Sequence, residues 1–238
     1  MPNLVVDIGN TALKAAYADG VTLGKTYRYQ GERMIDFILS LTVKNRPDVL
    51  VVASVRGTGD SDRDRLAGAC GRLVLIDSGD SGLYSSMGIP PYLSPDRLAS
   101  IVAARYLFKG KGCTVFDFGT TLTVDFVGPD GKYSGGNISP GCRTRFKALN
   151  RYSRILPLLD TPDTVEPAGT SLVSSIESGV ISGIIFELQG YFAMNPENIA
   201  VFTGGDAIYF AKRVKNAIFV VCNLVLMGLA IVADEYVE

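Results

Sequence analysis

Residues 7–14 read Asp-Ile-Gly-Asn-Thr-Ala-Leu-Lys and directly follow the apolar run Leu4-Val5-Val6. This order predicts a buried strand that ends in a carboxylate and then turns tightly. The glycine of the turn lets the backbone approach a ligand closely, because it has no side chain and can adopt positive φ. Asn10 and Thr11 add small polar groups, and Lys14 adds a positive charge. The stretch therefore carries groups that are expected to face a phosphate.

A second stretch of this kind lies in the other half of the chain. The run Thr114-Val115-Phe116 leads into residues 117–123, which read Asp-Phe-Gly-Thr-Thr-Leu-Thr. A single turn of this type is weak evidence, because Asp-x-Gly is common in ordinary hairpins. Two such turns, each opening one half of the chain, predict a duplicated domain with a nucleotide held between the halves.

A third strand, expected at residues 199–203, also ends in small residues. It runs into Thr203-Gly204-Gly205-Asp206, where the lack of side chains would let the backbone approach a purine or a ribose. An ordinary strand-to-helix turn is the more common explanation for such a stretch on its own. Because it is the third turn in a series, we interpret it as part of the ligand site.

Apolar periodicity predicts strands and helices in a similar order in both halves, with the strands forming mixed sheets. In the first half we expect strands at residues 15–17, 22–29, 49–53 and 73–76. We expect one helix at residues 34–41, a second between the strands at 49–53 and 73–76, and a third at residues 98–108. In the second half we expect strands at residues 114–118, 122–127, 133–138, 199–203 and 218–221, and helices at 143–149, 172–191 and 224–236. We expect Gly179 and Gly183 to interrupt the helix at 172–191, and Asn223 to cap the last helix.

Composition limits the classes of partner. The 238 residues are 47% hydrophobic and 20% charged, which is typical of a soluble globular protein. The 23 basic and 24 acidic side chains give a net charge of −1, so we expect neither nucleic acid nor a membrane as a partner, and any phosphate binding must be local. The apolar stretch 217–233 is shorter than the roughly 20 residues of a spanning helix. The N-terminus lacks the features of a signal peptide, so we expect a cytoplasmic protein.

The absence of histidine limits the chemistry. It excludes Ser-His-Asp and Cys-His catalysis, and it leaves carboxylate, lysine, cysteine or tyrosine as a general base. The four cysteines are far apart, without a Cys-x-x-Cys pair or a histidine to complete a zinc site. We expect Cys70, Cys113, Cys142 and Cys222 to be reduced residues that pack in the interior.

Asp96 and Arg97 stand at the start of the helix expected at 98–108, after a proline-rich segment. One interpretation is a carboxylate favoured by the helix N-terminus, with a solvated arginine beside it. The other is a general base beside an anion-binding guanidinium. The physical properties of the residues do not decide between them.

Five motifs together resemble the type III pantothenate kinases. They are Asp7-x-Gly9-Asn10-Thr11, Asp96-Arg97, Asp117-x-Gly119-Thr120, Gly135-Gly136-Asn137-Ile138-Ser139-Pro140-Gly141 and Thr203-Gly204-Gly205. The similarity extends over nearly the whole chain, and the glycine-rich fourth motif is its most specific part. The resemblance implies an α/β fold with duplicated ribonuclease H-like domains of the acetate kinase, sugar kinase, Hsp70 and actin class. It places these domains at residues 1–109 and 110–238 and implies a homodimer that phosphorylates pantothenate with ATP in the first step of coenzyme A synthesis.

The resemblance also implies roles for individual residues. Asp96 would be the catalytic base that takes the proton of the pantothenate hydroxyl, and Arg97 would bind the pantothenate carboxylate. Asp117 would bind a monovalent cation, K⁺ or NH₄⁺, and Asp7 would lie near the Mg²⁺ that accompanies ATP. The ATP site would comprise Asp7, Ile8, Gly9, Asn10, Thr11, Ala12, Leu13, Lys14 and Thr120. The pantothenate site would comprise Met87, Ser94, Pro95, Asp96, Arg97 and Leu172.

Three positions of the expected pantothenate site depart from the family pattern. The family usually has tyrosine at the position of Met87, glycine at that of Ser94 and threonine at that of Leu172. An alternative to the kinase is a non-catalytic ATP-binding or regulatory relative, because one fold can host many functions. The presence of both Asp96 and Arg97 favours the kinase.

Overall fold

The computed structural model describes residues 2–77 and 81–235, which form two compact units. Unit 1 contains the described residues up to Lys109 together with those from Asn223 onward. Unit 2 contains residues Gly110–Cys222. The division expected from the sequence placed residues 110–238 in one domain, and the structure differs for the segment from Asn223 onward. The reason is that the last helix packs on the sheet of unit 1.

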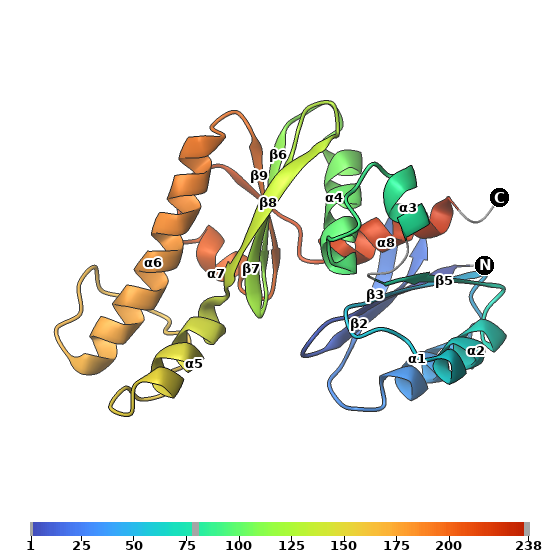
Figure 1. The fold of residues 1–238 in the computed structure, drawn as a ribbon, viewed down its shortest axis with the longest axis horizontal. Coiled ribbons are helices and arrows are strands. Elements are labelled where there is room, and N and C mark those ends of the chain that lie inside the picture. The colour runs from blue at the N-terminus through green and yellow to red at the C-terminus, as the bar shows by residue number, and fades with distance from the viewer. Residues whose placement is uncertain (1, 78–80, 236–238) are drawn as a thin grey trace. The chain divides into compact units, whose positions relative to one another are not determined.

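Unit 1 is built on a five-stranded mixed sheet (Figure 1). In spatial order its strands are β3 (Thr22–Tyr29), β2 (Leu13–Asp19), β1 (Asn3–Ile8), β4 (Val49–Ser54) and β5 (Arg72–Ile76). β1 is antiparallel to β2 and parallel to β4, and every residue of β4 is buried. A strand that is buried on both faces reads as a continuous apolar run, which explains the prediction at residues 49–53.

The two faces of this sheet are covered by different helices. Its helices are α1 (Met34–Thr42), α2 (Asp60–Gly68), α3 (Ser81–Ser86), α4 (Pro95–Leu107) and α8 (Leu224–Asp234). Ile38 of α1 and Leu66 of α2 are fully buried in one core with Leu4 and Val6 of β1. On the other face α8 packs on β1 and β4, and α4 packs on α8 (Figure 1). Tyr236, the expected end of α8, lies outside the described residues.

Unit 2 repeats the topology of unit 1. In spatial order its strands are β10 (Ile218–Val220), β9 (Ile199–Gly204), β6 (Cys113–Phe118), β7 (Thr121–Val127) and β8 (Tyr133–Pro140). β6 is antiparallel to β7 and parallel to β9, as β1 is to β2 and β4. The repeated order confirms the duplicated α/β fold that the sequence predicts.

The helices of unit 2 cover an aromatic core. They are α5 (Cys142–Tyr152), α6 (Leu172–Met194) and α7 (Ala207–Ala211). Phe118 contacts Phe202 and Phe210, with ring centroids 4.8 and 5.2 Å apart. Ile181 and Ile184 of α6 are buried in the same core.

Some sequence-based predictions of helices were wrong. α6 runs without a break through Gly179 and Gly183, because the packing of its apolar side chains outweighs the low helix propensity of glycine. α3 and α7 were not predicted, since they are six and five residues long and carry too little periodicity.

One helix of the described part of the chain, α6, has the length and mean hydropathy of a membrane span. Its buried face, which includes Ile176, Val180 and Leu188, belongs to the core of unit 2.

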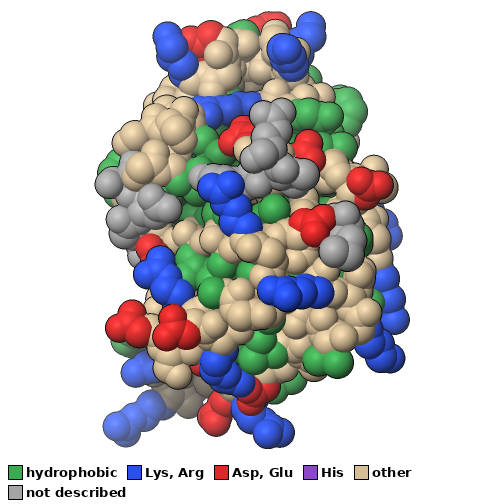
Figure 2. Space-filling model, turned by 90° about the vertical axis from the view of Figure 1, so that its right-hand side faces the viewer, with side chains coloured by type: hydrophobic (Ala, Val, Ile, Leu, Met, Phe, Trp, Pro, Cys, Tyr) green, Lys and Arg blue, Asp and Glu red, His purple; other side chains and the backbone are tan. Residues whose placement is uncertain are grey.

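Three cysteines, Cys70, Cys113 and Cys142, are buried as expected, whereas Cys222 is exposed. Basic and acidic side chains are interspersed on the face of the molecule shown in Figure 2, as the balanced composition leads one to expect.

Candidate active site

The first expected phosphate turn joins β1 to β2 in unit 1. The amide of Gly9 donates to the carbonyl of Ala12 at 3.1 Å, which closes the turn and leaves Asn10 and Thr11 exposed at its tip. Asp7 and Lys14 are directly opposite each other in the ladder, so their side chains lie on the same face of the sheet. The turn thus combines a carboxylate, an ammonium group and exposed small residues, as the sequence predicts.

The second turn joins β6 to β7 in unit 2 and is shorter, with residues 119–120 between its strands where the first turn has residues 9–12. The amide of Gly119 donates to the carbonyl of Thr121 at 3.0 Å, and Thr120 is exposed. Asp117 is half-buried, and its neighbours across the ladder are Thr123 on β7 and Thr203 on β9. Both threonines are buried, at 7% and 1% exposure, so two hydroxyls flank the carboxylate on one face of the sheet.

The third turn, at the end of β9, lies directly against the second. The amide of Asp206 donates to the carbonyl of Phe118 at 3.4 Å. A Cβ added to Gly204 would lie 2.4 Å from Oδ1 of Asp117, and Gly204 has a φ of +91°. Only glycine combines this backbone conformation with so close an approach. Burial raises the pKa of the Asp206 carboxyl above its usual range.

The start of α5 forms hydrogen bonds to the second turn, and the sequence did not lead us to expect this contact. The hydroxyl of Thr144 donates to the carbonyl of Thr120 at 2.6 Å, and the amide of Gly141 donates to the same carbonyl at 3.0 Å. A Cβ on Gly141 would lie 2.1 Å from the carbonyl oxygen of Gly119. The glycine-rich motif at residues 135–141 is the signal that could have indicated this packing.

A network on α5 and α6 fixes the end of this motif. The guanidinium of Arg145 donates to the carbonyl of Pro140 at 2.8 Å and forms an ion pair with Glu187, and both side chains of the pair are about one-fifth exposed. Ser139 donates to the same carboxylate at 2.7 Å. Both helices are therefore bonded to the segment that supports Thr120.

Asp96 and Arg97 lie in the first turn of α4 in unit 1. The amide of Arg97 donates to Oδ1 of Asp96 at 2.9 Å, which agrees with a carboxylate favoured by the helix N-terminus. Arg97, however, is only 6% exposed, so the solvated arginine of the first interpretation is not observed. Burial of a guanidinium is costly unless it is paired or hydrogen-bonded.

The segment from Met87 to Leu93, which precedes α4, accepts a hydrogen bond at each of its ends. The hydroxyl of Tyr84, a fully buried side chain, donates to the carbonyl of Leu93 at 2.9 Å. Arg105 of α4 donates to the carbonyl of Met87 at 2.6 Å. Met87 and Ser94 are half-buried, and Pro95, the first residue of α4, is buried. All of the expected pantothenate residues except Leu172 belong to unit 1.

Leu172 is the first residue of α6 in unit 2 and is 52% exposed. The residue before it, Ser171, caps this helix and accepts a hydrogen bond from the amide of Ser174 at 3.2 Å. Ser174 in turn accepts from the amide of Thr170 at 3.0 Å. The hydroxyls of Ser171 and Ser174 are therefore engaged in a capping box.

Among the described residues, no group of three or more acidic, cysteine or histidine side chains is arranged to hold a metal ion. A divalent ion that binds through one or two carboxylates and the phosphates of a nucleotide does not require such a group. Asp7, at the end of β1 beside the exposed turn, fits that kind of site.

Solved structures of low sequence identity share the fold. ROK hexokinase from Thermus thermophilus has a TM-score of 0.59 and 14% identity, with 100% of each chain covered. The activator of 2-hydroxyisocaproyl-CoA dehydratase from Clostridium difficile, solved with bound ADPNP, has a TM-score of 0.59 and 13% identity, with 99% of this chain and 95% of that chain covered. These similarities confirm the predicted fold class.

Sequence comparison identifies the family. The model of the type III pantothenate kinase family matches residues 3–194. A type III pantothenate kinase from Phocaeicola vulgatus is 36% identical over 235 residues, which cover 95% of this chain and 96% of that protein. A second one, from Bacteroides fragilis, is 35% identical and covers 95% of each chain. The chain belongs to the type III pantothenate kinase family.

Proposed function

We propose that Asp96 is the general base with which this kinase phosphorylates pantothenate. Membership of the family gives the reaction itself, which is the ATP-dependent phosphorylation of pantothenate to 4'-phosphopantothenate in coenzyme A biosynthesis. Family membership also gives ATP with a divalent metal as the phosphoryl donor. Phosphoryl transfer depends mainly on positioning and on neutralisation of charge, so a single carboxylate that accepts a proton is sufficient as a base.

The observation that carries the proposal is that Asp96 is followed, in the first turn of α4, by a buried arginine, Arg97. Arg97 is 6% exposed, and the carboxylate of Asp96 accepts a hydrogen bond from the backbone amide of Arg97. Arg97 is chemically suited to the carboxylate of pantothenate, because a guanidinium can donate two parallel hydrogen bonds to it. Asp96 would then accept the proton of the pantothenate hydroxyl. The rest of the acceptor site consists of Met87, Ser94, Pro95 and Leu172.

The donor site in this proposal consists of residues 7–14 and Thr120. Asp7 would bind Mg²⁺, which would neutralise charge on the phosphates, and Lys14 lies opposite Asp7 in the ladder and would add a second positive group. The exposed tip of the first turn and the exposed Thr120 would donate to phosphate oxygens. The third turn at residues 203–206 supplies a backbone surface for the adenosine.

Asp117 is the proposed ligand of K⁺ or NH₄⁺. The arrangement of oxygen atoms supports this role, because the hydroxyls of Thr123 and Thr203 flank the carboxylate on one face of the sheet. Hard cations prefer such oxygen ligands. We further propose a cytoplasmic homodimer that has neither nucleic acid nor a membrane as a partner.

The kinase activity on which the proposal depends is tested by coupling ADP release to a spectrophotometric assay, with and without pantothenate, and the role of Asp96 is tested with the variant Asp96→Asn. We expect ADP release that requires pantothenate and yields 4'-phosphopantothenate by mass spectrometry. Binding of ATP without any ADP release in the presence of pantothenate would instead indicate the non-catalytic ATP-binding relative.

A further inference from the structure

Arg56 lies beside the first phosphate turn because of the parallel pairing of β1 and β4. Ile8 and Ser54 are partners at the ends of these strands, and the amide of Val55 extends the ladder to the carbonyl of Ile8 at 3.3 Å. Asn10 and Arg56 each lie two residues beyond this pair. The ends of adjacent parallel strands meet at one edge of a sheet, so the loop after β4 adjoins the turn after β1.

The side chain of Arg56 contacts the turn itself. Its Nη2 donates a hydrogen bond to the carbonyl of Asn10. The loop is shaped by Ser54, which is buried and accepts from the amide of Arg56 at 3.3 Å, and by Gly57 with a φ of +73°. Arg56 itself is exposed. The backbone is therefore fixed while the guanidinium lies at the surface next to Asn10.

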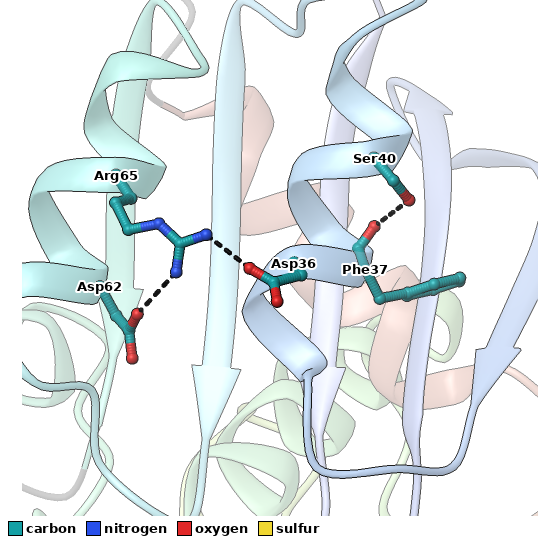
Figure 3. Close-up of polar contacts among 5 residues, drawn as sticks. All are labelled: Asp36, Phe37, Ser40, Asp62 and Arg65. Carbon is teal, nitrogen blue, oxygen red and sulfur yellow. Dashed lines mark hydrogen bonds and ion pairs between the residues drawn. The ribbon is translucent and has the colours of Figure 1, made fainter.

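Arg65 in the same unit shows the contrasting case of an arginine that is paired with carboxylates. Its guanidinium donates to Asp36 on α1 and, at 3.3 Å, to Asp62 on α2 (Figure 3). Within the part of the chain that the structure describes, Arg56 forms no ion pair with a carboxylate. Its contact is with a neutral carbonyl, so its positive charge is not neutralised by a neighbouring acidic side chain.

We infer that Arg56 is a phosphate-binding residue of the ATP site. A guanidinium has five N–H donors in a planar fork, and the bond to Asn10 uses only one of its nitrogens. The remaining donors match the oxygens of a polyphosphate, which carries several negative charges. Because the net charge of the chain is −1, a polyphosphate can be attracted only by a local group of cations, which Arg56 and Lys14 would form.

This inference rests on the proposed function of residues 7–14 as the ATP phosphate loop. Its test is to measure the Kd of ATP by calorimetry and the KM values of ATP and pantothenate in the full chain and its variants. Arg56→Gln keeps a side-chain N–H that can donate to the carbonyl of Asn10 but removes the charge. Arg56→Lys keeps the charge but removes the fork. Arg63→Gln, at an exposed position of α2, is the matched control for loss of one surface charge.

We expect Arg56→Gln to raise the Kd and KM of ATP by about tenfold, since a hydrogen bond to a charged group contributes more than a neutral one. Arg56→Lys should recover part of the loss, and Arg63→Gln should change nothing. The KM of pantothenate should be the same in all four proteins. Unchanged ATP affinity in Arg56→Gln, or an equal loss in Arg63→Gln, would overturn the inference while leaving the ATP loop intact. Failure of the unsubstituted chain to bind ATP would instead overturn both proposals.

Discussion

The amide of Arg97 donates to the Asp96 carboxylate at 2.9 Å, in the first turn of α4. This bond fixes the orientation of the carboxylate relative to a helix that is buried along most of its length. A base whose position is fixed before the substrate binds needs little reorganisation during proton transfer. The carboxylate of Asp96 therefore has two roles, because it accepts a hydrogen bond from the backbone of α4 and is also the proposed catalytic base.

The first prediction concerns this carboxylate. Asp96→Asn should lower kcat by roughly 10²–10⁴-fold, because an amide cannot accept the proton of the pantothenate hydroxyl. ATP affinity and the midpoint of thermal unfolding should change little, since the amide oxygen can still accept from the backbone of α4. Turnover and calorimetric ATP binding check this, with Asp64→Asn on the exposed side of α2 as control. Retention of most of the turnover would rule out Asp96 as the base.

The second prediction concerns Asp117. Turnover should be higher in potassium or ammonium than in sodium at equal ionic strength, because a larger and more easily dehydrated ion suits a site of protein and phosphate oxygens. Ionic strength must be fixed, since screening alone changes phosphate binding. Asp117→Asn should abolish the difference between the ions. Equal rates of the unsubstituted enzyme in sodium and potassium would contradict the assignment.

The third prediction concerns the departures from the family pattern at Met87 and Leu172. Two hydroxyls are missing from the expected pantothenate site, and a neutral hydrogen bond contributes about 0.5–1.5 kcal/mol, so the KM of pantothenate should be raised by roughly ten- to a hundred-fold. Met87→Tyr combined with Leu172→Thr should lower this KM and leave that of ATP unchanged.

Neighbouring hydroxyls could replace the missing bonds, and the structure narrows the choice. Ser171 is engaged in capping α6, which leaves the exposed Thr170 and Tyr92 as the candidates. If the unsubstituted enzyme already has a micromolar KM for pantothenate, and the double variant does not change it, the site is complete as it stands.

The fourth prediction concerns the support of the second phosphate turn. Thr144→Val removes the bond of 2.6 Å to the carbonyl of Thr120 and should raise the KM of ATP by about fivefold. Thr144→Ser keeps the hydroxyl and should restore the affinity. A purely structural role would lower the unfolding temperature of the valine variant without changing ATP affinity, so both quantities should be measured.

The fifth prediction concerns the thiols. Burial raises the pKa of Cys113 from 9.0 to about 11, and it also raises those of Cys70 and Cys142. The thiolate is the reactive form, so iodoacetamide at pH 8 should label the exposed Cys222 alone in the folded protein and all four cysteines after denaturation. Mass spectrometry of the labelled peptides checks this, and rapid labelling of Cys113 in the folded state would contradict it.

The same shift makes stability depend on pH. Folded Cys113 keeps its proton to a higher pH than the unfolded chain does, so its contribution is fully present below pH 9 and is lost as the pH rises through about 11. Denaturant titrations from pH 8 to 10.5 should show a falling free energy of unfolding, with a smaller slope in Cys113→Ala.

The amino-acid sequence by itself was sufficient to predict the strands beside the first two phosphate turns. It was also sufficient to identify the family. The strands that end at Asp7 and Asp117 could be predicted because apolar runs, glycines and small polar residues follow one another locally in the chain. The set of motifs was sufficient to identify the type III pantothenate kinases. Local patterns were insufficient for α3 and α7, which are too short to show a period.

The tertiary structure decided which distant residues meet. Arg56 reaches Asn10 across 46 positions of the chain, and Thr144 reaches Thr120 across 24. The burial of Arg97 and the packing of α8 on the sheet of unit 1 likewise depend on the tertiary structure. Each depends on strand pairing and helix docking, whose free energy comes from burying surfaces far apart in the sequence, so no local pattern encodes it.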